Sequence, residues 1–247
     1  MSLANVIQKL CSLSENPAAI KALATWPIFS ITSYNMVTRL INQGVRPRTV
    51  LDVGANVGQF AVASAKLFPN VLVHAFEPES YCVERLRNNT SSLEGIEIYP
   101  FALGDREGEA TLRVNSDSQQ SSLLPLAQAR PDTLFPGAQE LETVKVEILT
   151  LDRVFADIEL QPPVLLKVDA QGYEAQIIAG SVATLKRVDY VVLETSFEPM
   201  YEGQLSFVGI VQMMEELGFH FQRSVSWNVV PGTGHIFEID ILFSRAA

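Results

Sequence analysis

Two acidic side chains and two glycines occupy positions where they could bind a nucleoside that carries positive charge. Asp52 lies in the apolar run TVLDV, and the segment GANVG at residues 54–58 follows it directly. Glycines in such a turn let the backbone adopt positive φ angles and approach a ligand closely. The turn has neither the Gly-Lys-Ser/Thr ending of a nucleoside-triphosphate loop nor the third glycine of a dinucleotide fingerprint.

A second acid, Glu77, ends the next apolar run, 23 residues after Gly54. In nucleotide-binding α/β folds an acid at about this distance accepts hydrogen bonds from ribose hydroxyls. S-Adenosylmethionine has a ribose, a sulfonium and an ammonium group but no phosphate, so an acid-rich turn without a basic residue favours it. A nicotinamide cofactor remains an alternative, and with it an NAD(P)-dependent oxidoreductase, because NAD sites place an acid similarly.

The elements that must hold these groups alternate along the chain from residue 49 onwards. The expected strands are short apolar runs rich in β-formers at 49–53, 71–76, 96–101, 164–168 and 190–194. Helices are expected to begin near residues 58, 80, 172 and 206. This alternation predicts an α/β fold with a mostly parallel sheet and helices on both faces. The last two strands are joined by a link too short for a helical crossover, which predicts an antiparallel C-terminal hairpin at the sheet edge.

Two segments lie outside this alternation. Residues 1–46 are predicted to form an N-terminal helical extension to a main domain at 47–247, with apolar residues at helical spacing over 3–13 and again over 33–42. The extension is expected to cap the main domain, and a dimer contact or a substrate lid are the alternatives. The Ser-, Gln- and Pro-rich segment 115–143, which lies between two further expected strands, is long enough to form a lid.

The overall composition disfavours several classes of partner. The formal net charge is −10 and no basic run offsets it, so neither nucleic acid nor a membrane surface is expected as a partner. No apolar segment approaches the ~20 residues of a membrane span, and no secretory signal is recognisable. The two cysteines, Cys11 and Cys82, are expected to be reduced thiols in a cytoplasmic protein. The sequence leaves open whether the protein is a homo-oligomer.

Several motifs occur in a fixed order between residues 50 and 243, namely LDVGANVGQFA, AFEPES, FALGDREG, SSLLPL, LKVDAQGYE and IDILF. In this order they resemble the FkbM family of S-adenosylmethionine-dependent methyltransferases. The resemblance implies a class I Rossmann-like methyltransferase that methylates hydroxyl oxygens of small molecules, often sugars or polyketide-type products. Gln171 departs from the glutamate that many members carry at this position. A protein that keeps the fold and cofactor without turnover is a further alternative.

The resemblance also implies which residues contact the cofactor. The residues that would line its methionine end are Asp52, Gly54, Asn56 and Gly58. Glu77 would bind the ribose, and the residues that would flank the adenine are Ala102, Leu103 and Asp105. Ser121 and Ser122 match a family motif in the expected lid, so they are predicted to contact the substrate.

Methyl transfer to a hydroxyl requires the acceptor oxygen to be positioned behind the methyl group and its proton to be removed. Asp169 follows the fourth expected strand at the cofactor edge and is the predicted catalytic base. His235 in the last loop titrates near neutrality and is the rival base.

Other polar side chains are expected near the acceptor. Glu174 and Glu194 belong to the same sheet edge as Asp169, and Trp227 and Asn228 lie in the last loop. All four are predicted substrate contacts. Asp169, Glu174 and Glu194 could together supply oxygen ligands for Mg²⁺ if they converge, but the sequence does not show that they do, and no metal is assigned.

Overall fold

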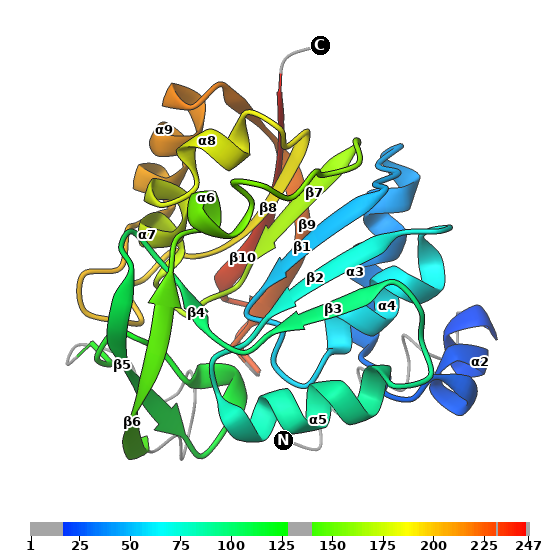
Figure 1. The fold of residues 1–247 in the computed structure, drawn as a ribbon, viewed down its shortest axis with the longest axis horizontal. Helices are drawn as coiled ribbons and strands as arrows, with labels where there is room; N and C mark the ends of the chain where they lie inside the picture. The colour runs from blue at the N-terminus through cyan, green and yellow to red at the C-terminus, as the bar shows by residue number, and fades with distance from the viewer. Residues whose placement is uncertain (1–16, 128–139, 231, 246–247) are drawn as a thin grey trace.

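The computed structural model describes residues 17–127, 140–230 and 232–245. The main sheet consists of β1 (Thr49–Val53), β2 (Leu72–Phe76), β3 (Ile96–Tyr99), β7 (Val164–Val168), β8 (Tyr190–Ser196), β9 (Phe219–Val229) and β10 (Ile236–Arg245). Their order across the sheet is β3-β2-β1-β7-β8-β10-β9 (Figure 1). The first five of these strands pair in parallel, and β10 is antiparallel to both of its neighbours.

Eight described helices accompany the strands. They are α2 (Pro17–Thr25), α3 (Ile31–Asn42), α4 (Gln59–Leu67), α5 (Ser80–Thr90), α6 (Leu151–Val154), α7 (Glu174–Ala179), α8 (Val182–Leu185) and α9 (Phe207–Glu216). One core cluster joins α3 and α4 to Leu165 and Leu242, and the other joins α7 and α9 to Leu166 and Ile241. Neighbouring strand residues therefore serve opposite faces of the sheet, as the pleat of a β-strand requires.

A small second sheet stands beside the ends of the main sheet (Figure 1). It contains β4 (Ala102–Leu103), β6 (Glu140–Leu149) and β5 (Gly108–Asn115) in that order. A 3₁₀ turn, η1 (Ser118–Gln120), follows β5. Strands were expected over 110–114 and 144–151, and β5 and β6 confirm them. Part of the expected lid segment, 128–139, falls outside the described residues.

The predicted fold class is confirmed, including the parallel sheet, the helices on both faces and the antiparallel C-terminal strands. The boundaries differ in places, because the helix expected near residue 172 begins at Glu174. Gln171 and Gly172 precede it with φ angles of 52° and 93°, and such left-handed backbone forms a turn in place of a helix. The helix expected over 3–13 lies outside the described residues. Among the residues described, no helix is long and apolar enough to cross a bilayer.

Candidate active site

A cavity of about 320 Å³ lies where β1, β2, β7 and β8 end. The strand order reverses between β1 and β7, and open parallel sheets bind ligands outside the carboxyl ends of their strands at such a reversal. Five segments far apart in sequence contribute to the lining: the β1 turn, the end of β2, β4, the β7 turn and the 117–123 segment. The topology therefore gathers polar groups from much of the chain into one site.

Gly54 lines the cavity where the turns after β1 and β7 touch. Its φ is +77°, and a Cβ atom built there would lie 1.8 Å from the backbone oxygen of Asp169. Only glycine fits this position. Gly58 has a φ of +96°, and a Cβ atom built there would lie 2.7 Å from the Leu86 side chain of α5. It does not line the cavity, in contrast to its expected contact with the cofactor.

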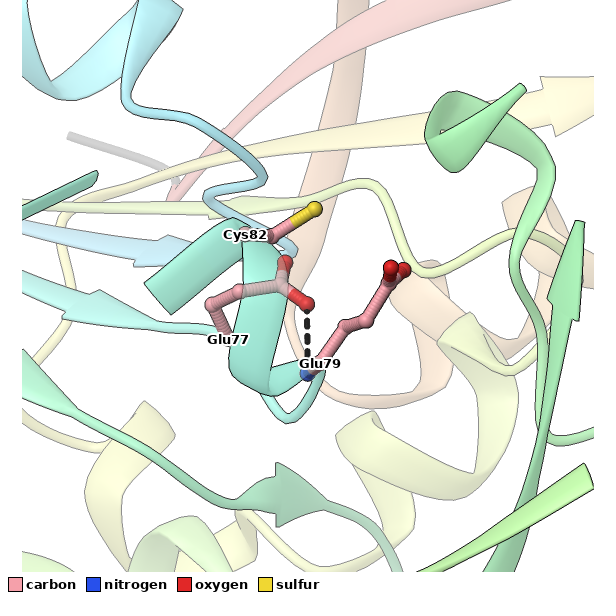
Figure 2. Close-up of side chains that lie close together, drawn as sticks. All are labelled: Glu77, Glu79 and Cys82. Atoms are coloured by element: carbon pink, nitrogen blue, oxygen red, sulfur yellow. Dashed lines mark hydrogen bonds between the residues drawn. The ribbon is translucent and has the colours of Figure 1, made fainter. Parts of the chain in front are cut away.

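Glu77 is anchored on the cavity wall by two backbone amides, and Figure 2 shows the one that belongs to Glu79. The Asn56 N–H donates to its Oε2 at 2.8 Å, and the Glu79 N–H donates to its Oε1 at 2.9 Å. Burial raises the pKa of Glu77 to about 7, although these two N–H groups favour the charged form and partly oppose the effect. A carboxyl group held in this way suits the acceptance of hydrogen bonds from two neighbouring hydroxyls, as a ribose presents them.

The described residues contain one group with metal-ligand spacing, and it surrounds this same acid. Atoms of Glu77, Glu79 and Cys82 lie within 4.8 Å of one another (Figure 2). Burial and the nearby acids raise the pKa of the Cys82 thiol to about 12, whereas a metal needs the thiolate. Both Glu77 oxygens already accept backbone hydrogen bonds, so the group favours hydrogen bonding over metal ligation. Asp169, Glu174 and Glu194 do not meet as a ligand set among the residues described.

Asp52 lies beneath the cavity and does not line it, in contrast to its expected contact with the cofactor. It is completely buried, and its Oδ1 lies 3.6 Å from Nζ of Lys167. Lys167 was not predicted as a site residue, although a lysine inside an apolar strand next to acids is a usable signal. Its ammonium group lies 3.1 Å from Oδ2 of Asp169. Asp52 therefore acts on the site indirectly, through its ion pair with Lys167.

Asp169 and Glu194 line the cavity together, and their pKa values move in opposite directions. Burial is the largest single influence on Asp169 and opposes its ionisation, but the Lys167 charge and the hydrogen bonds from Glu194, Gln171 and Lys167 together outweigh it and lower the pKa of this carboxyl. For Glu194, burial and the charge of Asp169 both raise the pKa well above its ordinary value. The surroundings thus favour the ionised form of Asp169 and the protonated form of Glu194.

Two further acids on β10, Glu238 and Asp240, complete this wall and were missed by the sequence analysis. Burial is the largest cause that raises their pKa values, to about 7 for Asp240. Asn228, a predicted contact, lines the cavity and donates to Oε2 of Glu238 at 2.9 Å. The alternation FEIDI could have indicated them, because it places two acids on one face of an otherwise apolar strand.

The 117–123 segment closes one side of the cavity, as the lid prediction anticipated for this part of the insertion. Ser121 Oγ donates to Oε2 of Glu79 at 3.1 Å. Ser122 Oγ donates to the backbone oxygen of Gln171 at 2.6 Å. Both predicted serines line the cavity, and they join its cofactor side to the turn after β7.

Besides Asp52 and Gly58, four further predicted site residues do not line the cavity. His235 has a 55% exposed side chain 3.5 Å from Glu198, so it does not face Asp169 across the site. Trp227 is 46% exposed and lies under the guanidinium of Arg39. The remaining two are Asp105, which pairs with Arg106, and Glu174, which accepts hydrogen bonds from the Ala170 and Gly172 N–H groups. The chain order places them near the site, but their side chains turn elsewhere.

The start of α3 reaches the cavity, which the sequence analysis did not foresee. The lining residues from this region are Ser30, Thr32, Ser33 and Met36. Val37 and Leu40 of the same helix pack into the core of the main sheet. The last part of the N-terminal extension thus supplies one wall of the site.

A model of the FkbM methyltransferase domain matches residues 52–221, more than half of the 247-residue chain. The chain belongs to the FkbM methyltransferase family. It is an S-adenosylmethionine-dependent methyltransferase, as the sequence motifs predicted. The FkbM-family chain is 27% identical to 2-O-methyltransferase NoeI of Sinorhizobium fredii over 188 residues, which cover 73% of this chain and 77% of that protein. It is 28% identical to hexuronic acid methyltransferase AglP of Haloferax volcanii over 171 residues, 68% of this chain and 65% of that protein.

Solved structures resemble the fold at low sequence identity. Magnesium protoporphyrin IX methyltransferase (ChlM) from Synechocystis PCC 6803 with bound SAM has a TM-score of 0.48 at 13% identity, covering 87% of this chain and 78% of that one. The Pyrococcus horikoshii protein PH1948, which is named as an RNA methyltransferase, has a TM-score of 0.48 at 12% identity. The match covers 87% of this chain and 83% of that one.

The cavity of this FkbM-family protein suits S-adenosylmethionine. Glu77 presents a fixed carboxyl group to the cavity, and another part of the lining is largely apolar and consists of Ala102, Leu103, Leu112, Tyr173 and Ile177. Lys167 is the one cationic side chain among the described lining residues, and it forms ion pairs with Asp169 and Asp52. No cation on this wall is thus free for a pyrophosphate, whereas acids suit a sulfonium and an ammonium group.

Proposed function

We propose that this methyltransferase transfers the methyl group to a hydroxyl oxygen of a small-molecule or saccharide acceptor. The observation that carries the proposal is the Asp169 carboxylate, which lines the cavity after β7 and stays ionised beside Lys167. The name of NoeI, a 2-O-methyltransferase, supports an oxygen acceptor. The acid-lined wall supports an acceptor that donates hydrogen bonds.

In the proposed reaction Asp169 orients the acceptor O–H group and takes its proton. Bound S-adenosylmethionine supplies an electrophilic methyl group, and S-adenosylhomocysteine is the product. As the new C–O bond forms, the acceptor oxygen gains positive charge and its proton becomes strongly acidic. A carboxylate with a lowered pKa is therefore basic enough, and its fixed negative charge stabilises the developing cation.

Glu194 and His235 are weaker candidates for the base. Burial and the charge of Asp169 raise the pKa of Glu194 well above its ordinary value, which favours the protonated form, and a protonated carboxyl group can donate a hydrogen bond but cannot take up the acceptor proton. His235 does not line the cavity. We therefore assign the proton transfer to Asp169 and give Glu194 the role of binding an acceptor oxygen, with Asn228, Ser121 and Ser122 as further acceptor contacts. The cofactor contacts that we propose are Gly54, Asn56, Glu77, Ala102 and Leu103.

Calorimetry with S-adenosylhomocysteine and with NAD tests the cofactor site. We expect S-adenosylhomocysteine to bind and NAD not to bind. Glu77→Gln should weaken the binding of S-adenosylhomocysteine about 10- to 100-fold, because a hydrogen bond to a charged group contributes about 1.5–3 kcal/mol. The exposed Glu84→Gln on α5 is the matched control. Binding of NAD without S-adenosylhomocysteine would overturn the proposal.

A second experiment tests the base. Methyl transfer from labelled S-adenosylmethionine is measured over a panel of neutral sugars for the native protein, Asp169→Asn and His235→Ala. We expect Asp169→Asn to lower kcat about 10²- to 10⁴-fold and His235→Ala to leave it unchanged. Native turnover by Asp169→Asn would exclude Asp169 as the base.

A further inference from the structure

Gln171 connects the two acids that face the reaction. Its Nε2 donates to Oδ1 of Asp169 at 3.0 Å and to Oε2 of Glu194 at 2.7 Å. Its Oε1 accepts from the hydroxyl of Tyr201 at 2.8 Å. The ionised carboxylate of Asp169 can only accept hydrogen bonds, so the NH₂ group faces the acids and the amide oxygen faces Tyr201. A glutamate at this position has no N–H group and could not make the same contacts.

The backbone of Gln171 is held in a conformation that this residue type rarely adopts. Its φ is 52°, in the left-handed region, and such positions persist when the surrounding structure stabilises them. The Ser122 hydroxyl holds its backbone oxygen. Glu174 accepts hydrogen bonds from Ala170 and Gly172 on either side. The turn thus directs one amide between two carboxyl groups.

We propose that Gln171 is a positioning residue that, together with Lys167, fixes the Asp169 carboxylate for the acceptor hydroxyl. Each Asp169 oxygen has its own donor, because Oδ2 accepts from Lys167 at 3.1 Å and Oδ1 accepts from Gln171. Two donors at separate oxygens fix the plane of the carboxylate. Tyr201 completes the arrangement by fixing the amide of Gln171. This inference rests on the proposed role of Asp169 as the base.

Titratable groups from several surrounding elements act on Asp169. They are Asp52 on β1, Lys167 on β7, Glu174 on α7, Glu194 on β8, and Glu238 and Asp240 on β10. All of these groups except Lys167 are acids, and their negative charges disfavour the ionised form of Asp169. The amide of Gln171 therefore acts with Lys167 against this repulsion.

The test measures the titration of Asp169 itself. NMR spectra of protein labelled with ¹³C at the aspartate carboxyl carbons are recorded over a range of pH values. Asp169→Asn assigns the resonance by its loss. We expect Gln171→Glu to raise the titration midpoint of Asp169 by about one pH unit, because the substitution replaces a hydrogen-bond donor to Asp169 with another acid. Tyr201→Phe should raise the midpoint by less, since it releases only the amide orientation. The exposed Gln222→Glu on β9 adds the same charge elsewhere and should leave the midpoint unchanged.

Unchanged Asp169 midpoints in Gln171→Glu and Tyr201→Phe, with native binding of S-adenosylhomocysteine, would overturn the inference. If Gln171→Glu does not fold, Gln171→Met and Tyr201→Phe decide the question. Once an acceptor is identified, the acid limb of the pH profile of kcat/KM should move by the same amount as the midpoint. Native turnover by Asp169→Asn would refute the proposed base and leave the titration result standing, so the two failures are distinguishable.

Discussion

The Lys167 ammonium group lies 3.1 Å from Oδ2 of Asp169, which stands two residues further along the chain and directly follows β7. On the neighbouring strand β1, Asp52 approaches the same ammonium group to 3.6 Å. Lys167 is only 4% exposed, so solvent screens neither contact strongly. Burial alone would lower the pKa of Lys167, but Asp169, Asp52 and Asp240 outweigh it and raise the pKa. The ion pair both supports the fold and keeps the proposed base ionised.

Removal of Lys167 should destabilise the protein strongly. Lys167→Met leaves Asp52 and Asp169 without their cation, and breaking a buried ion pair typically costs about 3–5 kcal/mol. The exposed Lys145, which pairs with Glu109, is the matched control, and Lys145→Met should cost less than about 1 kcal/mol. Urea unfolding measures both. Adding Asp52→Asn to Lys167→Met should recover part of the loss, and equal stabilities of the two single variants would contradict this reading.

Stability should fall as the pH rises from about 5 to about 8. Burial raises the pKa values of Glu77, Glu174 and Asp240 to about 7, above the values near 4 that they have in an unfolded chain. The folded state therefore binds more protons in this range, and the free energy of unfolding decreases as these protons are lost.

The slope of this dependence can be tested at one residue. Glu77→Gln should reduce by up to one the difference in bound protons between the folded and unfolded states. The slope of the unfolding free energy against pH should then become shallower by up to about 1.4 kcal/mol per pH unit between about pH 5 and pH 7. The exposed Glu147→Gln should leave the slope unchanged. Unfolding free energies measured at several pH values give the slopes, and a native slope in Glu77→Gln would contradict the prediction.

Gly54 should not tolerate a side chain, for reasons of space as well as backbone angle. Gly203 is a matched control, because its φ of +78° nearly equals the +77° of Gly54 while nothing lies within 4 Å of the added Cβ. Gly203→Ala should cost about 1–2 kcal/mol from the left-handed backbone alone. Gly54→Ala should cost more, and it should also weaken S-adenosylhomocysteine binding because the turn must move away from Asp169. Denaturant unfolding and calorimetry check the pair, and equal costs would exclude crowding as the cause.

Acceptors with a carboxylate should be poor substrates. The acceptor wall presents Asp169, Glu194, Glu238 and Asp240, and a further anion brought against it is disfavoured by like-charge repulsion. At about pH 8, where more of these acids are ionised, kcat/KM for a neutral hexoside should exceed that for its uronate about tenfold or more. Glu238→Gln should narrow this difference. Preference for the uronate would show that the wall does not select by charge.

The sequence alone determined the fold class and the cofactor edge, because both depend on local patterns. Apolar runs such as 49–53 and 164–168 define buried parallel strands whatever surrounds them. The turn at Gly54 and the acid at Glu77 follow their strands directly, and the carboxyl ends of parallel strands meet at one edge. Several residues close to a strand end were therefore placed correctly on the cavity, among them Asp169, Glu194 and Asn228.

The tertiary structure decided which side chains face the cavity. Sequence position places Asp52 beside Gly54, but the pleat turns its carboxylate beneath the site toward Lys167. His235 shares the final hairpin with Asn228, yet only Asn228 lines the cavity. The bridge from Gln171 to Glu194 joins the turn after β7 to the neighbouring strand β8, 23 positions further along the chain. Such contacts depend on strand register, on the left-handed turn after β7 and on long-range packing, none of which a local pattern encodes.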